Sequence, residues 1–175
     1  MKVFLTTMVQ WDCALCLRIF RLNGRTLLDA VMYGLSRLGD GYFYALVGIV
    51  LFIVNTALAI QIVPVLLFAF ALELTLYKIL KNKTRRNRPF EILPNIRFLM
   101  HPPDKFSFPS GHTSAAFVMA TIFSTFMPAL TLPFILIAAL IGFSRIYNGL
   151  HFPSDVIAGM ALGVVCAKMS LSIIG

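Results

Sequence analysis

The sequence predicts an all-α fold, a polytopic membrane helical bundle of about five transmembrane helices preceded by N-terminal amphipathic interfacial helices. Of the 175 residues, 59% are apolar and only 13% are charged, whereas soluble domains have about 25% charged residues. The mean hydropathy is +0.86, and the apolar residues fall in runs long enough to cross a bilayer. The length fits a single domain over residues 1–175.

Residues 8–38 are predicted to form two amphipathic helices that lie in the membrane interface. Residues 8–22 and 26–38 carry apolar side chains at helical spacing with charged side chains between them, a pattern too charged to span a bilayer. Asn23-Gly24 separates the two helices. The alternative is a pair of helices packed against the bundle.

Two transmembrane spans are expected after a turn at residues 39–41. The first covers residues 42–59 and the second residues 60–80, with Pro64 near the start of the second, where proline is least disruptive. Glu73 lies inside the second span, and an ionisable group at that depth should face the bundle interior. There it either contacts the cations of a site or makes a structural hydrogen bond.

A proline-rich connection, residues 89–108, follows, and it can dip into the interface and act as a lid. Three further spans are then expected at residues 110–126, 132–147 and 154–173. Gly159 and Gly163 lie four residues apart in the last span, a spacing that lets two helices approach closely.

Three polar segments interrupt the apolar sequence, at residues 81–89, 109–112 and 144–155. We call them the first, second and third polar segments. When the crossings are counted, the second span ends at the first polar segment and the third span begins at the second. The fourth and fifth spans meet at the third polar segment. All three therefore lie at one membrane face, which predicts a single site.

The first polar segment is rich in cations. Six of the fifteen Lys and Arg residues, in a chain of net charge +8, lie between Lys78 and Arg88. Lys81 and Arg88 are about two helical turns apart and share a face if the helix continues. A phosphate group needs several such donors. Contact with anionic lipid head groups is the alternative, whereas nucleic acid fits poorly because so apolar a chain offers little soluble surface.

The second polar segment predicts the N-terminus of a helix. Ser110 is a good N-cap and Gly111 allows close approach of the backbone to a ligand. The free N–H groups and the positive end of the helix dipole favour an anion there. His112 then lies in the first turn, beside that anion.

The third polar segment carries Ser144 and Arg145 at the end of the fourth span, and His151 and Asp155 at the start of the fifth. If residues 151–155 form one turn, the carboxylate can accept the proton of one ring nitrogen, which leaves the other nitrogen more basic. A neutral imidazole oriented in this way can attack phosphorus. A His–Asp pair that only caps the helix is the alternative.

The combined pattern K-x6-RP, PSGH and SR-x5-H-x3-D resembles the type 2 phosphatidic acid phosphatase family, whose signature is shared with vanadium haloperoxidases. Every signature position is present, with the family's spacing inside each motif. The motifs lie within residues 81–155, and the helical frame extends the likeness from about residue 10 to the end. Many bacterial relatives have six spans, so this chain departs from them in lacking the first.

The resemblance implies a phosphatase that works through a phosphohistidine and needs no metal or other cofactor. It implies that neutral His151 is the nucleophile, that Asp155 orients it, and that protonated His112 first protonates the leaving oxygen and then activates water. The groups implied to bind the phosphoryl oxygens are Lys81, Arg88, Arg145, Ser110 and the backbone of Gly111. Ser144 and Glu73 are candidate supporting residues.

We therefore expect an integral membrane enzyme that removes phosphate from a phosphorylated lipid, of the undecaprenyl diphosphate, phosphatidylglycerophosphate, phosphatidate or lipid A type. A non-catalytic lipid-binding protein, a transporter and a vanadate-dependent oxidase using the same anion site are the alternatives. Head-group contacts are expected from the connection at residues 89–108, through Arg97, His101 and Lys105.

Two indications conflict about the membrane face on which the site lies. The excess of arginine on the site's face favours the cytoplasmic side by the positive-inside rule. The resemblance places the site on the outer, periplasmic face of the bacterial inner membrane, and the site itself accounts for several of the cations. We expect the outer face. The sequence indicates no oligomeric state.

Overall fold

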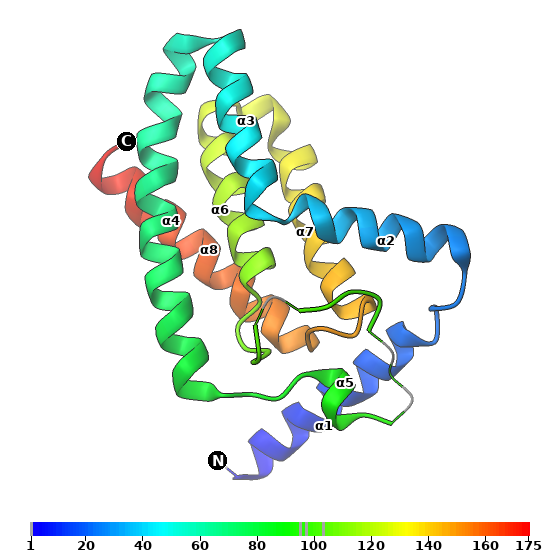
Figure 1. Ribbon diagram of the computed structural model, residues 1–175. Coiled ribbons are helices and arrows are strands. Elements are labelled where there is room, and N and C mark those ends of the chain that lie inside the picture. Colours follow the sequence, from blue (N-terminus) through cyan, green and yellow to red (C-terminus); the bar gives the residue numbers. More distant parts are fainter. Residues whose placement is uncertain (1, 95, 97, 103) are drawn as a thin grey trace.

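The computed structural model describes residues 2–94, 96, 98–102 and 104–175, and this part of the chain is all-helical, as predicted (Figure 1). The elements are α1 (Lys2–Phe20), α2 (Thr26–Leu38), α3 (Gly41–Val54), α4 (Thr56–Thr84), α5 (Pro89–Ile92), α6 (Gly111–Phe126), the short 3-10 helix η1 (Pro128–Leu130), α7 (Thr131–Tyr147) and α8 (Pro153–Ile173).

The helices α1 and α2 form an N-terminal pair beside the polar end of the bundle, and α2 runs across the direction of the other helices (Figure 1). Gly24 separates the pair with a φ of +95°, a conformation that glycine adopts easily. On α2, Met32 is buried while Leu27 is 80% exposed. One side of α2 thus packs on the bundle and the other is exposed, so the packed arrangement is found for α2, while a position in the membrane interface stays a prediction.

The helices α3 and α4 form an antiparallel pair that rises from the polar end and returns to it (Figure 1). The side chain of Asn55 caps α4 by accepting a hydrogen bond from the Leu58 N–H at 3.0 Å. This cap starts the second helix at Thr56, so the predicted boundary near residue 59 was wrong. Pro64 consequently lies within α4 and not near its start.

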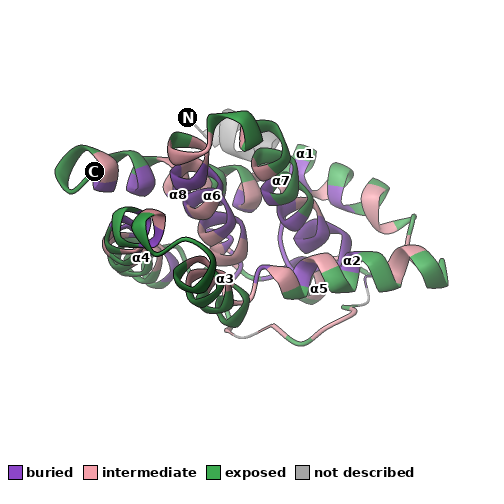
Figure 2. Ribbon diagram, turned by 90° about the horizontal axis from the view of Figure 1, so that it is seen from above, coloured by how far each residue is buried: buried purple, intermediate pink, exposed green. Residues whose placement is uncertain are grey.

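The helix α6 occupies the centre of the bundle, where α4, α7 and α8 pack around it (Figure 2). Its buried side chains include Val118 and Ile122, which form a core cluster with Ile62 and Val65 of α4 and Ala167 of α8. Because other helices surround α6, its side chains contact protein rather than lipid. This explains how a helix of 16 residues with several polar side chains can lie within the bundle.

Close contact between α6 and α8 depends on two glycines, as the four-residue spacing predicted. A Cβ atom added to Gly159 would lie 2.5 Å from the carbonyl oxygen of Ser110, and one added to Gly163 would lie 2.2 Å from that of Ser114. Both separations are impossible for a real side chain, so α8 can approach the backbone of α6 only with glycine at these positions.

Within the described residues, three stretches are long and apolar enough to cross a membrane, namely residues 56–92, 128–147 and 153–173. A fourth candidate joins α2 and α3, which are bent by 63° at the predicted turn around Gly39. The polytopic helical bundle is therefore confirmed, and a helix lies at each of the five predicted spans. The count of five crossings stays a prediction, because α3 and α6 are shorter than the usual span.

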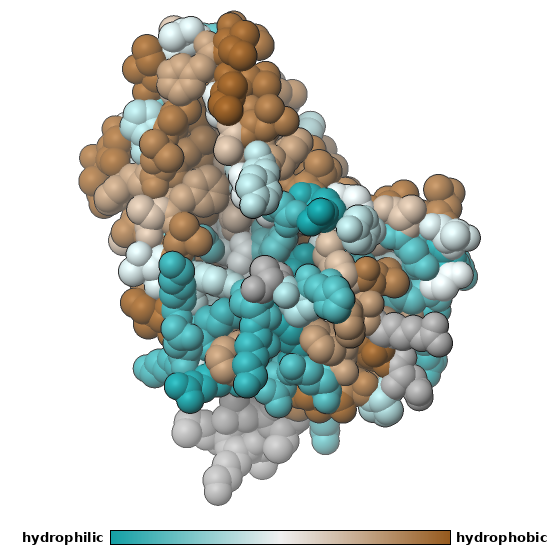
Figure 3. Space-filling model, in the orientation of Figure 1, coloured by the Kyte–Doolittle hydropathy of each residue, from teal (hydrophilic) through white to brown (hydrophobic). Residues whose placement is uncertain are grey.

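The surface of the molecule divides into an apolar and a polar half. The upper part in Figure 3, which includes α3 and most of α4, is hydrophobic, whereas the lower part around the ends of α4 and α7 is hydrophilic. Exposed Ile53, Val54 and Leu67 belong to the apolar part. The apolar half is the part suited to lipid chains, so the chain is an integral membrane protein with its polar segments at one membrane face.

Candidate active site

The three polar segments meet at the polar end of the bundle, as predicted from the count of crossings. The first lies where α4 ends, the second where α6 begins, and the third between α7 and α8 (Figure 1). The charged and imidazole side chains predicted for the site are largely buried there, and five of them are less than 10% exposed: Lys81, Arg88, Arg145, His151 and Asp155. The hydroxyl residue Ser110 is fully buried as well.

Lys81 and Arg88 converge on a carboxylate that the sequence analysis did not select. The Nζ of Lys81 lies 2.6 Å from Oδ2 of Asp104, and Nη2 of Arg88 lies 2.6 Å from Oδ1. The hydroxyl of Tyr77 donates a hydrogen bond to the same carboxylate. Burial opposes the charged form, but the hydrogen bonds from Lys81 and Tyr77 outweigh it and lower the pKa of Asp104.

These cations do not lie on one continuous helix. The helix α4 ends at Thr84, and Arg85 follows in the left-handed conformation with a φ of 47°. The condition under which Lys81 and Arg88 would share a helix face, a helix continuing to Arg88, is therefore not met, although their side chains do meet. They meet because the chain turns after Thr84 and α5 begins at Pro89.

His151 lies against the same cluster of cations. Its Nε2 is 3.4 Å from Nη1 of Arg88, which also donates a hydrogen bond to the Leu150 carbonyl at 2.8 Å. Burial lowers the pKa of His151 well below its ordinary value, and the nearby charges of Arg88, Arg145 and Lys81 lower it further. The imidazole is accordingly neutral at pH 7, as a nucleophile requires.

Asp155 faces the other ring nitrogen of His151 at a longer distance than predicted. Its Oδ2 is 3.8 Å from Nδ1 of His151, beyond hydrogen-bonding range. Oδ2 instead accepts the backbone N–H of Phe152 at 2.8 Å, and Oδ1 accepts Arg86 at 2.7 Å. The backbone carbonyl of Asp155 accepts the N–H of Ser110 at 3.0 Å, which joins the second polar segment to the third.

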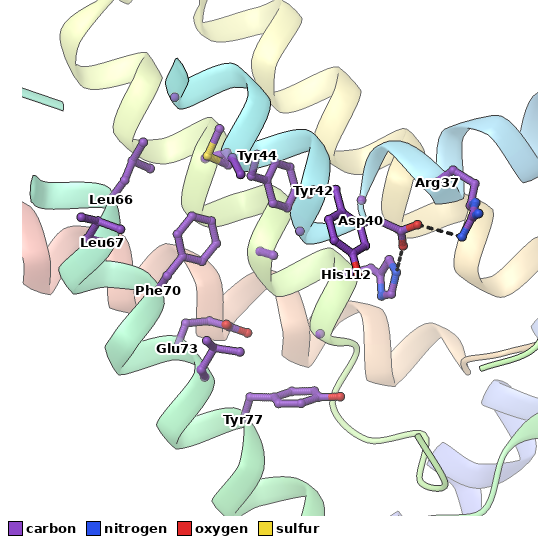
Figure 4. Close-up of a pocket in the computed structure, with 18 of the residues that line it drawn as sticks. Arg37, Asp40, Tyr42, Tyr44, Leu66, Leu67, Phe70, Glu73, Tyr77 and His112 are labelled. Atoms are coloured by element: carbon purple, nitrogen blue, oxygen red, sulfur yellow. Dashed lines mark hydrogen bonds and ion pairs between the residues drawn. The ribbon is translucent and has the colours of Figure 1, made fainter. Parts of the chain in front are cut away.

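His112 is paired with an acid at the break between α2 and α3. Its Nε2 lies 2.9 Å from Oδ1 of Asp40, and the other carboxylate oxygen accepts a hydrogen bond from Arg37 at 3.1 Å (Figure 4). The carboxylate therefore sits between an exposed guanidinium and the imidazole. This contact fixes the orientation of the His112 ring at the start of α6.

Donor atoms without partners gather in this buried region. Within the described part of the chain, Nε of Arg88, Nε of Arg145 and Nδ1 of His151 are buried and have no hydrogen-bond partner. Arg145 otherwise donates to the Ser36 hydroxyl and, at 3.4 Å, to the sulfur of Met100. Buried donors normally have partners, so the two guanidinium nitrogens suit an oxyanion, whereas Nδ1 of His151 faces Asp155.

The remaining predicted residues have local roles. Ser110 shares a hydrogen bond of 2.8 Å with Thr113, and no side-chain cap is made at this helix start. A Cβ atom at Gly111 would lie 2.8 Å from the ring of Tyr77, so only glycine fits there. Ser144 donates to the Ile141 carbonyl of its own helix at 2.7 Å, away from the cations.

A cavity of about 850 Å³ opens between α3, α4 and α6. Its wall is mainly apolar, with Tyr44, Leu66 and Phe70 in Figure 4, and its polar end reaches Tyr77 and His112. Arg145 of the third polar segment also lines the cavity, but Lys81, Arg88 and His151 do not. These three side chains are buried. Arg88 is held by an ion pair with the Asp104 carboxylate and a hydrogen bond to the Leu150 carbonyl.

Glu73 lines this cavity between the apolar wall and the polar end (Figure 4). It is 2% exposed, and the described residues provide it with no ion pair. Glu73 therefore faces the bundle interior, as predicted, without contacting the cations of the site.

The three residues of the proline-rich connection that were predicted to contact the lipid head group, Arg97, His101 and Lys105, differ in where they lie. Arg97 lies outside the described residues. His101 lines the cavity and packs against Phe98 with ring centroids 5.0 Å apart, while Lys105 is exposed beside Phe106. Among the described residues of this connection, Asp104 contacts Lys81 and Arg88, and the sulfur of Met100 contacts Arg145.

No cluster of three or more His, Cys, Asp or Glu side chains with metal-binding geometry occurs in the described ranges. The prediction that the reaction needs no metal stays a prediction.

Several acids that hold the site together were missed by the sequence analysis. They are Asp12, Asp40 and Asp104, each of which is an isolated acid in a helix, a turn or a loop. Arg86 was counted only as one cation of a cluster. The signal that was available is the small number of acids: with seven Asp and Glu in the chain, each one is a candidate partner for the cations.

Comparisons with known proteins agree with this geometry. The sequence profile of the PAP2 superfamily matches residues 62–175. The chain is 32% identical to the "Bacitracin transport permease protein BcrC" of Bacillus licheniformis, over 81% of this chain and 70% of that protein. It is 31% identical to an "Undecaprenyl-diphosphatase" of Sulfolobus acidocaldarius, over 89% and 75%. The crystal structure of Aquifex aeolicus LpxE superposes with a TM-score of 0.78 at 37% identity, over 89% and 94%.

Proposed function

This chain belongs to the PAP2 superfamily, and from that premise we propose that it is a membrane lipid phosphatase that transfers the phosphoryl group to His151. The observation that carries the proposal is the meeting of three motifs around one set of buried donors. Arg88 of the first polar segment contacts His151 of the third at 3.4 Å, and the second joins the third through Ser110 and Asp155.

The proposed reaction has two steps. Nε2 of His151 forms a bond to phosphorus while the bond to the lipid oxygen breaks, and the leaving oxygen takes the proton of His112. Water then attacks the phosphohistidine, giving a proton back to His112, and the P–N bond breaks to release inorganic phosphate. His112 thus acts as general acid in the first step and as general base in the second.

The cations would stabilise the charge that develops on the phosphoryl oxygens. Lys81, Arg88 and Arg145 would bind these oxygens together with the N–H groups at the start of α6, and fixed donors of this kind provide much of the barrier lowering in phosphoryl transfer. Asp155 would orient the imidazole of His151. The 3.8 Å gap between them then closes when the ring becomes charged.

Asp104 occupies the position that an oxyanion would need. Its carboxylate contacts Lys81 and Arg88, both of which are proposed phosphate ligands. A phosphoryl group would therefore displace this carboxylate, which is one-third exposed and lies on the connecting loop.

The apolar cavity supports a lipid substrate. Its volume and lining suit part of an acyl or isoprenoid chain, with the head group at Tyr77 and His112. A polyprenyl diphosphate is the substrate that we favour, since a relative at 31% identity is named an undecaprenyl-diphosphatase. Phosphatidylglycerophosphate, phosphatidate and lipid A are the other substrates to be tested.

The proposed location is the bacterial inner membrane, with the site on the outer face. In support of this, the structure explains several cations by contacts within the site: Lys81, Arg86, Arg88 and Arg145 are all paired or buried. These residues need not report on topology. Labelling of an added cysteine near Lys105 by an impermeant reagent in intact cells would test the outer face.

Phosphate release from purified protein in detergent tests the proposed activity. The panel is undecaprenyl diphosphate, phosphatidylglycerophosphate, phosphatidate and lipid A. We expect release from at least one substrate, unaffected by a chelator, and loss of release in His151→Gln; Lys83→Gln is the matched control on an exposed residue. Unchanged turnover in His151→Gln would reject the proposal. Halide oxidation that requires vanadate would favour the oxidase alternative instead.

A further inference from the structure

A chain of contacts links the N-terminal helix to the third polar segment. Asp12 of α1 is buried, and its Oδ1 accepts the backbone N–H of Ser154 at 2.9 Å. Its Oδ2 accepts the Ser154 hydroxyl and Nη2 of Arg86, the latter at 2.7 Å. The amphipathic helix is thus attached at the first turn of α8, where the candidate nucleophile's acid partner lies.

The guanidinium of Arg86 bridges two carboxylates. One terminal nitrogen contacts Asp12, and the other lies 2.7 Å from Oδ1 of Asp155 and 2.7 Å from the Ser154 hydroxyl. The same group stacks over the ring of Phe152, with 4.2 Å between its central carbon and the ring centroid. A planar guanidinium can hold two anions in fixed directions, which an ammonium group cannot do.

Burial makes this bridge necessary. The side chains of Asp155 and Asp12 are 0% and 8% exposed, whereas that of Arg86 is 24% exposed. A buried carboxylate is unfavourable unless it is paired and hydrogen-bonded. With Arg86 on Oδ1 and the Phe152 N–H on Oδ2, the carboxylate of Asp155 cannot rotate freely. Its Oδ2 therefore stays turned towards Nδ1 of His151.

We propose that Arg86 and Asp12 are positioning residues that hold Asp155 charged and correctly turned for His151. The inference rests on the proposed function, because it takes His151 as the nucleophile. Neither residue touches the groups proposed to bind phosphate. Arg86 acts through Asp155, and Asp12 acts through Arg86 and the Ser154 backbone. The interfacial helix α1 is on this account part of the catalytic architecture.

Steady-state kinetics of single variants in detergent tests this inference. In Arg86→Gln we expect kcat to fall by about 10- to 100-fold, the usual cost of losing an outer partner of a reacting group, while KM stays within about twofold because Arg86 does not bind substrate. Arg86→Lys, which can keep one of the two ion pairs, should recover part of kcat. Arg85→Gln is the matched control, since this neighbouring arginine is exposed and its side chain donates a hydrogen bond to the Asn82 carbonyl of its own helix.

Asp12→Asn gives a second, independent measurement. It keeps the shape of the side chain and should lower kcat by about 3- to 10-fold without changing KM, and the double variant with Arg86→Gln should be no worse than Arg86→Gln alone. Each variant is first checked for a wild-type elution profile and melting temperature. If Arg86→Gln does not fold, Arg86→Lys and Asp12→Asn decide the question.

The outcomes separate the two proposals. If His151→Gln is inactive but Arg86→Gln and Asp12→Asn both match Arg85→Gln in kcat, the positioning role is wrong and the proposed function survives. A rise in KM equal to the fall in kcat/KM would likewise overturn it. If His151→Gln remains active, the proposed function itself fails.

Discussion

At the scale of single residues, the carboxylate of Asp104 occupies the position where the phosphate of the substrate is proposed to bind. Its carboxylate bridges Lys81 and Arg88 at 2.6 Å each. These contacts keep two buried cations paired, which lowers the cost of burying them. The same contacts oppose the proposed binding of substrate, because a phosphoryl group would have to displace the Asp104 carboxylate from Lys81 and Arg88. The loop carboxylate therefore both stabilises the site and competes with its ligand.

Replacement of Asp104 should strengthen phosphate binding. In Asp104→Asn the competing charge is removed, so we expect the inhibition constant for inorganic phosphate to fall by about tenfold, or ~1.4 kcal/mol. Asp29→Asn removes one negative charge on α2, where the carboxylate contacts the Tyr147 hydroxyl and the Gly24 N–H, and serves as the control. Weaker phosphate inhibition in Asp104→Asn than in this control would show that the carboxylate supports the ligand instead.

The protonation of His151 gives a second prediction. Burial and then the charges of Arg88, Arg145 and Lys81 lower its pKa well below the ordinary 6.5. As pH falls, the ring therefore stays neutral through 6.5 and gains a proton only when pH falls through the lowered pKa. Nitrogen NMR of 15N-histidine protein can follow this, since the chain has three histidines. His151→Gln identifies the signal, and a midpoint at or above pH 6.5 would contradict the prediction.

At the scale of elements, the position of the site depends on how closely α8 approaches α6. Gly159 faces the Ser110 carbonyl and Gly163 faces the Ser114 carbonyl, with no room for a Cβ atom at either. These contacts bring the first turn of α8 beside the first turn of α6. The second and third polar segments meet for that reason.

Gly163→Ala should therefore destabilise the protein. The new methyl group would lie 2.2 Å from a backbone oxygen unless the helices separate, and overpacking of this kind costs about 1–3 kcal/mol. We expect a lower melting temperature and reduced kcat. Gly34→Ala on α2 is the control, because a Cβ atom there meets nothing within 4 Å. Equal melting temperatures for the two variants would show that the helix contact is not limiting.

At the scale of the whole molecule, the bundle has a polar end and an apolar half, which match the head group and the tail of the proposed substrate. The cavity between α3, α4 and α6 is apolar along its wall and reaches His112 and Arg145 at its polar end. An amphipathic lipid has the same division between tail and head group. The shape of the bundle thus favours a substrate that enters from the membrane with its phosphate at the polar end.

Narrowing the cavity should discriminate against long tails. Gly48 lines the cavity and has open space around it. In Gly48→Leu we expect KM for a polyprenyl diphosphate to rise by about tenfold, which corresponds to ~1.4 kcal/mol, with little change for a short, water-soluble phosphate ester. Gly34→Leu, outside the cavity, is the control. An equal rise for both substrates would indicate a general disturbance rather than loss of tail binding.

The local patterns of the sequence predicted much of this architecture, since helices and motifs depend on nearby residues. The bundle, the break at Gly24 and the meeting of the polar segments all followed from hydropathy and spacing. The partners of the site did not, because Asp12 and Asp155 are joined through Arg86 by contacts between residues 69 and 74 positions apart. Pairing at such distances is set by the packing of helices and leaves no periodic signal.

We propose that His151 receives the phosphoryl group in a site formed by all three polar segments. This transfer can be followed by rapid acid-free quenching of the enzyme during turnover of a 32P-labelled lipid diphosphate and then by peptide mass spectrometry. We expect a base-stable, acid-labile phosphate on His151, absent from His151→Gln. Phosphate on another residue, or wild-type turnover by His151→Gln, would contradict it.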